Sequence, residues 1–289
     1  VRFGVVSLRA PRHYAPLAQV IALQIDNDRA KLDVGDIKAK DIAFNYQYAG
    51  GEITVYQLNG KALKRYMEWS ADYFNQLQPG DVTYSFNPAR RSSKYSTNDF
   101  FDGVTYTIDL RQPTGARIVD LRLTDGTPVT DDMPIRLGMN SYRMGHLTQK
   151  GGALEGQSFP VLFDSKAQYG EEEGTIRHLT LRYLTEVKHG QYQGVPPQRW
   201  KLIGMEGYEP QRAIVKRLLN EGVIQVPTTD DGRYTNVASI NVKNALFRNA
   251  DDYRAALTSL EQQRQAAVDP VQQRRLQDRI ALIKALNDF

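Results

Sequence analysis

Residues Ile53–Phe74 read I-T-V-Y-Q-L-N-G-K-A-L-K-R-Y-M-E-W-S-A-D-Y-F, and the fold can be worked out starting from this stretch. Its first six residues are mostly β-branched, aromatic or apolar, which is typical of a strand. Asn59-Gly60 then predicts a tight turn. From Lys61 onward, apolar residues recur at helical spacing. The stretch therefore predicts a strand, a turn and an amphipathic helix in succession.

The next clear pattern is an alternation of apolar and polar residues over Val104–Leu110. Pro113-Thr114-Gly115 predicts a turn, and the apolar positions of Arg117–Leu123 follow it, so the two segments together predict a β-hairpin. A second short alternation over Ile135–Met139 predicts another strand. The chain thus combines strand–helix units with a hairpin.

The strand at Ile135–Met139 leads into Asn140–Gly152, which reads N-S-Y-R-M-G-H-L-T-Q-K-G-G. We expect a loop here, and ligands commonly bind at loops that leave strand ends. Glycines such as Gly151 and Gly152 let the backbone approach a ligand closely. Composition alone leaves two interpretations open, because Tyr142 could equally be an ordinary packing residue.

The two ends of the chain suggest its domain organisation. Val1–Val6 is expected to be a strand and Pro16–Ile25 a helix. A strand at residue 1 indicates that the sequence is a fragment whose N-terminal partner is missing. The composition changes from about residue 206, and the sequence from there on predicts short helices. A break near Asp269-Pro270 separates the last two of them. We therefore predict a domain over residues 1–205 and a mostly helical appendage over 206–289.

Composition excludes several classes of function. The 289 residues are 41% hydrophobic and 24% charged, as in globular proteins, and the net charge of +4 comes from scattered Lys, Arg, Asp and Glu. This mixed surface does not favour nucleic acid as a partner. The absence of cysteine excludes disulfides, thiolate zinc sites and cysteine nucleophiles, and it fits an exported bacterial protein. No apolar run reaches the ~18 residues that a membrane span needs.

Catalytic motifs are also missing from the sequence. The four histidines are isolated, whereas a zinc or two-metal centre needs clustered histidines and carboxylates. Gly60-Lys61 is followed by Ala62, so there is no phosphate-binding P-loop, and neither nucleophile-elbow nor dinucleotide-binding glycine motifs occur. We therefore predict no catalytic residue and no metal ligand in this chain. His146 is expected to be a satisfied or solvent-facing side chain.

The sequence does contain aromatic and amide side chains that could bind a ligand. The chain has 16 tyrosines and 10 phenylalanines, several of them beside turns. Two aromatic side chains facing each other can sandwich a planar ring, which contributes roughly 1–3 kcal/mol per base. Nearby Asn and Arg side chains can then recognise polar edges or an anion. The alternative is that these tyrosines form ordinary pairs within a sheet.

Four segments, in order, resemble a known family. They are Asp41–Gln76, Asp102–Asp109 (D-G-V-T-Y-T-I-D), the N-x-Y-R and G-G pair within Asn140–Gly152, and Arg199–Leu202 (R-W-K-L). Together they resemble the C-terminal, nucleoside-binding domain of the 5′-nucleotidase family, nearest to bacterial 2′,3′-cyclic-nucleotide 2′-phosphodiesterase/3′-nucleotidases. The resemblance implies an α+β fold in which mixed β-sheets are sandwiched by helices. It also implies an N-terminal metallophosphoesterase domain that carries the divalent metals, whereas none is expected in this chain.

The resemblance also implies a binding site for a nucleoside or nucleotide. By position, Tyr142 and Tyr48 match the two aromatics that stack the base, and Asn140 and Arg143 flank the stacking position. Gly151 and Gly152 match the family's glycine pair, although the path to them from Tyr142 is longer here. Ala153 also stands where the family often has an acidic residue.

Two hypotheses follow. In the first, the chain is the nucleoside-binding domain of a nucleotide phosphohydrolase, exported to the bacterial periplasm or cell surface and inactive without its catalytic domain. In the second, it is a non-catalytic surface module for binding or adhesion that retains the fold. The altered glycine segment and the appendage motivate the second hypothesis.

Overall fold

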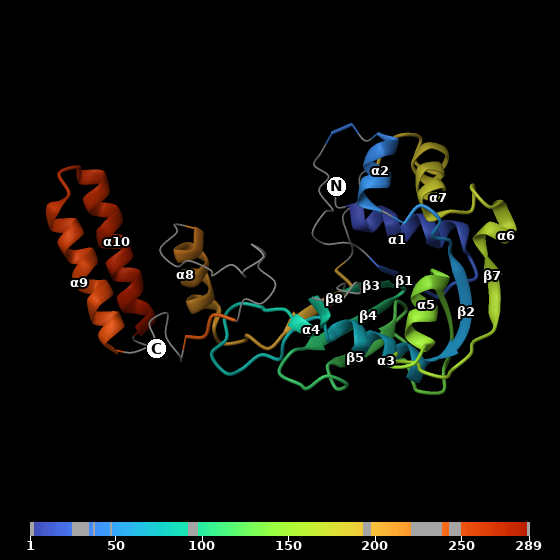
Figure 1. The fold of residues 1–289 in the computed structure, drawn as a ribbon, viewed down its shortest axis with the longest axis horizontal. Helices are drawn as coiled ribbons and strands as arrows, with labels where there is room; N and C mark the ends of the chain where they lie inside the picture. The colour runs from blue at the N-terminus through green and yellow to red at the C-terminus, as the bar shows by residue number, and fades with distance from the viewer. Residues whose placement is uncertain are drawn as a thin grey trace. The chain divides into compact units, whose positions relative to one another are not determined.

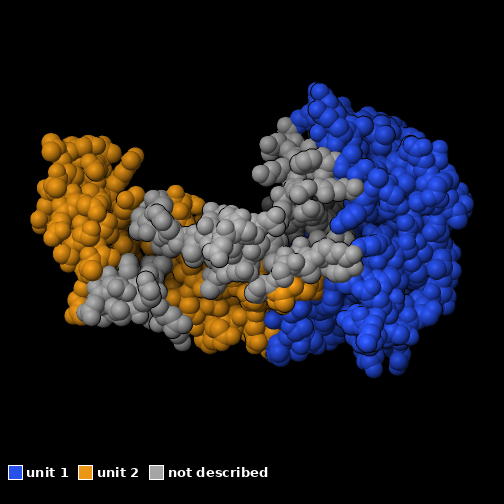
Figure 2. All heavy atoms as spheres, in the orientation of Figure 1, with its two compact units in different colours: residues 1–73, 95–109, 113–202 blue, residues 74–94, 110–112, 203–289 orange. Residues whose placement is uncertain are grey.

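The computed structural model describes residues 3–24, 35–36, 38–46, 48–91, 98–192, 198–220, 239–242 and 250–287. Two compact units make up the chain (Figure 2). Unit 1 comprises Val1–Tyr73, Tyr95–Asp109 and Pro113–Leu202, and unit 2 comprises Phe74–Lys94, Leu110–Gln112 and Ile203–Phe289. The chain passes between the units more than once, and the division expected at residues 205 and 206 stays a prediction.

A five-stranded mixed sheet forms the centre of unit 1 (Figure 1). Its strands lie in the order β3-β1-β6-β2-β7, with only the β1–β6 pair parallel. The strands are β1 (Val20–Gln24), β2 (Thr54–Asn59), β3 (Asp99–Asp102), β6 (Pro134–Met139) and β7 (Val161–Asp164). The predicted strands at 53–58 and 135–139 are confirmed. Their β-branched and apolar residues occupy the central strands, where both faces are buried.

A three-stranded sheet, in the order β5-β4-β8, adjoins the helix α3 (Gly60–Ala71). Its strands are β4 (Val104–Asp109), β5 (Ile118–Leu123) and β8 (Trp200–Ile203). The first two form the predicted antiparallel hairpin. The buried Glu68 of α3 accepts hydrogen bonds from the N–H groups of Gly115, Arg117 and Ile118 at 3.1, 3.0 and 2.7 Å. One carboxylate thus fixes the hairpin to the helix.

The helix α3 follows β2 as predicted. Asn59 is its N-cap, because its side chain accepts a hydrogen bond from the Ala62 N–H at 2.9 Å. Leu63, Tyr66 and Met67 lie on its buried face. The periodicity of this segment therefore places the helix correctly and also identifies the face that packs against the sheet.

Other helices surround the sheet of unit 1, and Figure 1 shows α1, α2 and α7 gathered on one side of it. Tyr14 of α1, Ile42 of α2 and Leu179 of α7 share one hydrophobic cluster. The helices not yet placed are α1 (Phe3–Tyr14), α2 (Ala39–Asn45), α5 (Ser141–Thr148), α6 (Ser165–Tyr169), α7 (Ile176–Arg182) and the π-helix Tyr183–Val187. The helix α7 continues directly into the π-helix, so the two form one helical segment over Ile176–Val187.

Two predictions near the N-terminus are wrong. The expected strand at Val1–Val6 falls on α1 as far as it is described, and the expected helix at Pro16–Ile25 is the strand β1 over Val20–Gln24. Both segments are short apolar runs, in which periodicity cannot distinguish a strand from a buried helix. Packing decides the outcome, because Val20–Leu23 is almost completely buried between two neighbouring strands.

Unit 2 contains helices and short extended segments. Its helices are α4 (Pro88–Arg91), α8 (Glu209–Asn220), α9 (Ala250–Ala266) and α10 (Pro270–Asn287). The predicted break near Asp269-Pro270 is confirmed. Val82, Val215 and Leu218 form a small core, against which Leu282 of α10 packs. Val82 also donates its N–H to the carbonyl oxygen of Ile240 at 2.9 Å.

Candidate functional site

The segment predicted as a loop, Asn140–Gly152, is mostly the helix α5, so this part of the prediction is wrong. Asn140 begins the helix: its side-chain oxygen accepts the Arg143 N–H at 2.7 Å. Met144 and Leu147 lie three residues apart and are both buried, which is the spacing of one helix face. An N-cap residue and this spacing are the signals that could have predicted the helix.

The two predicted stacking residues are the exposed aromatics of this region. Tyr142, in the first turn of α5, is 54% exposed, and Tyr48 is 44% exposed. The Tyr48 ring contacts Tyr46 edge-on, with centroids 5.6 Å apart. The hydroxyl of Tyr46 in turn accepts a hydrogen bond from the Asn140 amide at 3.4 Å. The structure therefore links Tyr48, through Tyr46, to the residue that begins α5.

Arg143 points inward rather than toward solvent. Its side chain is 2% exposed and forms an ion pair with Asp99, with Nε and Oδ2 2.9 Å apart. Asp99 also accepts the Tyr66 hydroxyl at 2.6 Å, and the guanidinium lies over the Trp69 ring at 4.9 Å. Arg143 therefore anchors α5 from beneath, while its neighbour Tyr142 stays exposed.

The electrostatics of this cluster follow from its burial. Burial on its own would lower the pKa of Arg143, but the pKa is raised because Asp99 and Tyr66 stabilise its charge. Burial raises the pKa of Tyr66 well above its ordinary value, and the Asp99 carboxylate raises it further. Tyr66 therefore stays protonated and serves as a hydrogen-bond donor.

The glycine pair lies at the other end of α5. Gly151 adopts a φ of +82°, and its N–H donates to the Glu155 carboxylate at 3.0 Å. A side chain on Gly152 would collide with the carbonyl oxygen of Leu147. Because α5 rises about 1.5 Å per residue, its eight residues separate this pair from Asn140 by roughly 12 Å. The structure therefore does not bring the glycine pair to the tyrosines; the pair lies in the turn that follows the C-cap residue Gln149.

Two further residues of the site were missed by sequence reasoning. Glu52 accepts the Ser141 N–H at 2.8 Å, so a carboxylate supports the N-terminal end of α5. Trp69, half-buried on α3, contacts the His146 ring with centroids 5.4 Å apart. His146 also lies 2.9 Å from the Gln149 amide, so its expected role as a satisfied histidine is confirmed.

The described residues offer neither a metal centre nor a membrane-spanning helix. Within the described ranges, no three potential ligands among His, Cys, Asp and Glu gather to hold a metal ion. Among the helices that the structure describes, none combines the length and apolar character that crossing a membrane requires.

Comparisons with known proteins agree with this architecture. Residues 10–150 match the family described as 5′-nucleotidase, C-terminal domain. The chain is 27% identical over 176 residues to the trifunctional nucleotide phosphoesterase protein YfkN of Bacillus subtilis (strain 168), a match that covers 56% of this chain. It spans only 11% of that relative's length.

Solved structures share the fold. One, from Staphylococcus aureus, is described as a candidate 5′-nucleotidase in complex with alpha-ketoglutarate, at 20% identity and a TM-score of 0.54. Another is a 5′-nucleotidase precursor from Thermus thermophilus, at 15% identity and a TM-score of 0.51. Each similarity covers 70% of this chain, and 36% and 35% of the respective structures. The mixed α+β fold and the resemblance are both confirmed, since residues 10–150 match the 5′-nucleotidase C-terminal domain and the solved structures share the fold.

Proposed function

We propose that this chain binds the nucleoside part of a nucleotide, with the base stacked between Tyr48 and Tyr142. The observation that carries the proposal is the exposure of these two aromatics, 44% and 54%, in a 5′-nucleotidase C-terminal domain. Each lies beside a buried, hydrogen-bonded residue, Tyr46 and Arg143 respectively. A planar ring that covered both tyrosines would remove apolar surface from water and gain the stacking energy.

The neighbouring residues have supporting roles in this proposal. Asn140 orients the first turn of α5, and its amide links that turn to Tyr46. Arg143 acts from beneath the site, where its ion pair with Asp99 holds the helix that carries Tyr142. Gly151 and Gly152 act at the far end, where they allow the tight turn that follows α5. Binding would thus rest on exposed rings held by buried polar contacts.

Phosphate ester hydrolysis is assigned in this proposal to an N-terminal metallophosphoesterase domain of the same protein, which would supply the divalent metals. Substrates would be nucleoside monophosphates or 2′,3′-cyclic nucleotides, and the protein would act in nucleotide catabolism after export from a bacterial cell. This chain's own contribution is to hold the nucleoside while the phosphate extends toward the catalytic domain. Alone, the chain is expected to bind nucleosides without hydrolysing phosphate esters.

Isothermal titration calorimetry with adenosine and with AMP tests the proposal. Tyr142→Ala and Tyr48→Ala are each expected to weaken binding by about 1–3 kcal/mol, roughly 5- to 150-fold in Kd. Leu162→Ala is the matched control, because Leu162 is an apolar side chain of similar exposure, 41%, on β7. Equal affinities of the wild type and Tyr142→Ala would remove the stacking role.

The second candidate is a surface module for binding or adhesion that keeps the fold without nucleoside recognition. The separation of the glycine pair from Tyr142 by the whole of α5 favours it. Thermal melts distinguish the two candidates, since nucleoside binding to the folded state raises Tm. If neither adenosine nor AMP raises Tm at millimolar concentration, the surface module is the better description.

A further inference from the structure

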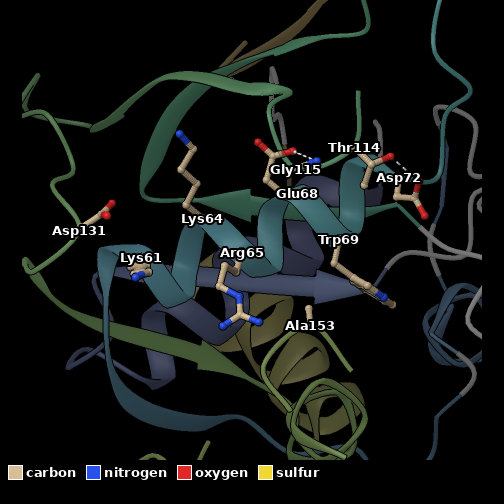
Figure 3. A pocket seen from close by; sticks show the side chains of 10 residues that line it. All are labelled: Lys61, Lys64, Arg65, Glu68, Trp69, Asp72, Thr114, Gly115, Asp131 and Ala153. Carbon is tan, nitrogen blue, oxygen red and sulfur yellow. Dashed lines mark hydrogen bonds between the residues drawn. The ribbon is translucent and has the colours of Figure 1, made fainter. Parts of the chain in front are cut away.

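A shallow groove of about 480 Å³ runs along the exposed side of α3 (Figure 3). Three cationic residues of α3 line it: Lys61, Lys64 and Arg65. The turn at Thr114-Gly115 forms part of its wall. The remaining lining residues are Glu68, Trp69, Asp72, Asp131 and Ala153. All of them belong to unit 1, so the groove lies within one compact body.

The acids and the cations of this groove are used differently. Glu68 accepts the three backbone N–H groups of the hairpin, and Asp72 accepts the Thr114 hydroxyl at 2.8 Å. By contrast, the side chains of Lys61, Lys64 and Arg65 form no hydrogen bond or ion pair with any residue that the structure describes. The three cations are therefore available to an anionic ligand, while the carboxylates of Glu68, Asp72 and Asp131 balance their charge in the lining as a whole.

The position of the three cations on the helix strengthens this argument. Lys61 lies in the first turn of α3, where the helix dipole favours acidic side chains and disfavours basic ones, and Lys64 and Arg65 lie in the second turn. The first turn contains no acidic residue. The charge of Lys61 is therefore opposed by the helix dipole. An anion bound in the groove would compensate the unfavourable charge.

Trp69 adds an aromatic surface at the far end of the groove. It lies one helical turn beyond Arg65 and two turns beyond Lys61, about 6 and 12 Å along the axis. Figure 3 shows the indole extending from α3 on the side where Ala153 lies, with Arg65 nearer the middle of the helix. A phosphate near the cations would therefore leave an attached ring within reach of the indole.

We propose that this groove binds a small phosphorylated aromatic molecule of the mononucleotide type, separately from the Tyr48–Tyr142 site. Lys61 and Arg65, which lie one helical turn apart on α3, hold the phosphate, and the ring lies against Trp69, which extends to the same side of the helix as Arg65 (Figure 3). Trp69 contacts His146 and Arg143 of α5, so a ligand that binds against Trp69 also affects the contacts of the helix that carries Tyr142. The proposal does not depend on base stacking at Tyr142.

Tryptophan fluorescence provides a direct test, because the chain has two tryptophans, Trp69 and Trp200. In a Trp200→Phe, Tyr142→Ala protein, the signal reports Trp69 and the first site is disabled. Titration with AMP is expected to change this fluorescence saturably. Adenosine, which lacks the phosphate, and inorganic phosphate, which lacks the ring, are each expected to bind about tenfold more weakly or less.

Charge reversal in the same background supplies the decisive comparison. Lys61→Glu with Arg65→Glu is expected to weaken AMP binding about tenfold or more. Lys61 and Arg65 are exposed, so their replacement removes no buried contact, and a thermal melt of the variant shows whether lost binding is due to unfolding. Lys40→Glu, on the exposed side of α2, makes the same kind of charge change outside the groove and should leave affinity unchanged. The proposal is overturned if AMP gives no saturable signal or if the reversed variant binds equally well.

Discussion

Substituting Arg143 by methionine should destabilise the protein far more than substituting its neighbour Tyr142 by alanine. Methionine retains much of the length of the arginine side chain but cannot pair with Asp99, whose side chain is 0% exposed. Removing one partner of a buried ion pair typically costs about 3–5 kcal/mol, because the other charge stays buried and uncompensated. The cation–π contact with Trp69 is lost as well. Arg143→Met is therefore expected to lose at least about 3 kcal/mol.

Urea denaturation followed by circular dichroism measures this loss. With a slope of about 3 kcal/mol per molar urea, the midpoint should fall by roughly 1–2 M. Tyr142→Ala is the matched control on the same helix: its ring is more than half exposed, so its effect should stay within about 0.5 kcal/mol. The contrast between adjacent residues separates an anchoring role from a surface role.

A double-mutant cycle shows whether the ion pair itself is responsible. Asp99→Asn removes the orphaned charge, so the double variant with Arg143→Met should recover at least about 1.5 kcal/mol relative to the sum of the single effects. If Arg143→Met costs less than about 1 kcal/mol, or the two substitutions are additive, the pair does not anchor α5 and the reasoning fails.

Two further predictions concern other buried groups. Glu68→Gln should lower the free energy of unfolding by about 1.5–3 kcal/mol, because a neutral amide cannot replace a carboxylate that accepts three backbone N–H groups. An unchanged urea midpoint would contradict this prediction. Burial raises the pKa of Tyr46, Tyr66 and Tyr106 above the ordinary value of 10.0. Above pH 10 the folded state therefore retains tyrosine protons that the unfolded state loses. The contribution of these tyrosines to stability is complete below pH 10 and falls as the pH rises above it. Thermal melts at about pH 9 to 11.5 should show Tm decreasing only in the upper part of that range.

The segments that the sequence predicts correctly are those with a long and clean period. The β2–α3 unit and the β4–β5 hairpin each give enough positions to distinguish a period of 2 from a helical one. The strand β1 is too short for this distinction, because four apolar residues in a row fit either a strand or a helix. Its identity as a strand depends on β3 and β6, which lie far away in the sequence.

The candidate site shows the same limit in its side chains. The exposed aromatic Tyr142 could be selected from sequence as a candidate, but the direction of Arg143 could not. Its partner Asp99 lies 44 positions away, and no local pattern connects the two. The sequence did not predict the helix α5, because Gly145 and the glycine pair are typical of a loop. In the structure, the N-cap at Asn140 and the burial of Met144 and Leu147 favour the helix instead.

The central place of β6 in the five-stranded sheet has a consequence for biosynthesis. β6 is hydrogen-bonded to both β1 and β2, and Gln19 and Arg136, 117 positions apart, bond to each other beside the parallel pair. Chains are made from the N-terminus, so β1 and β2 leave the ribosome before β6, the strand that joins them. Until Met139 emerges, the nascent chain exposes apolar strands whose main partner does not yet exist, which is the condition under which chains aggregate or recruit chaperones. A chain truncated before β6 should therefore yield an unassembled polypeptide rather than a smaller sheet.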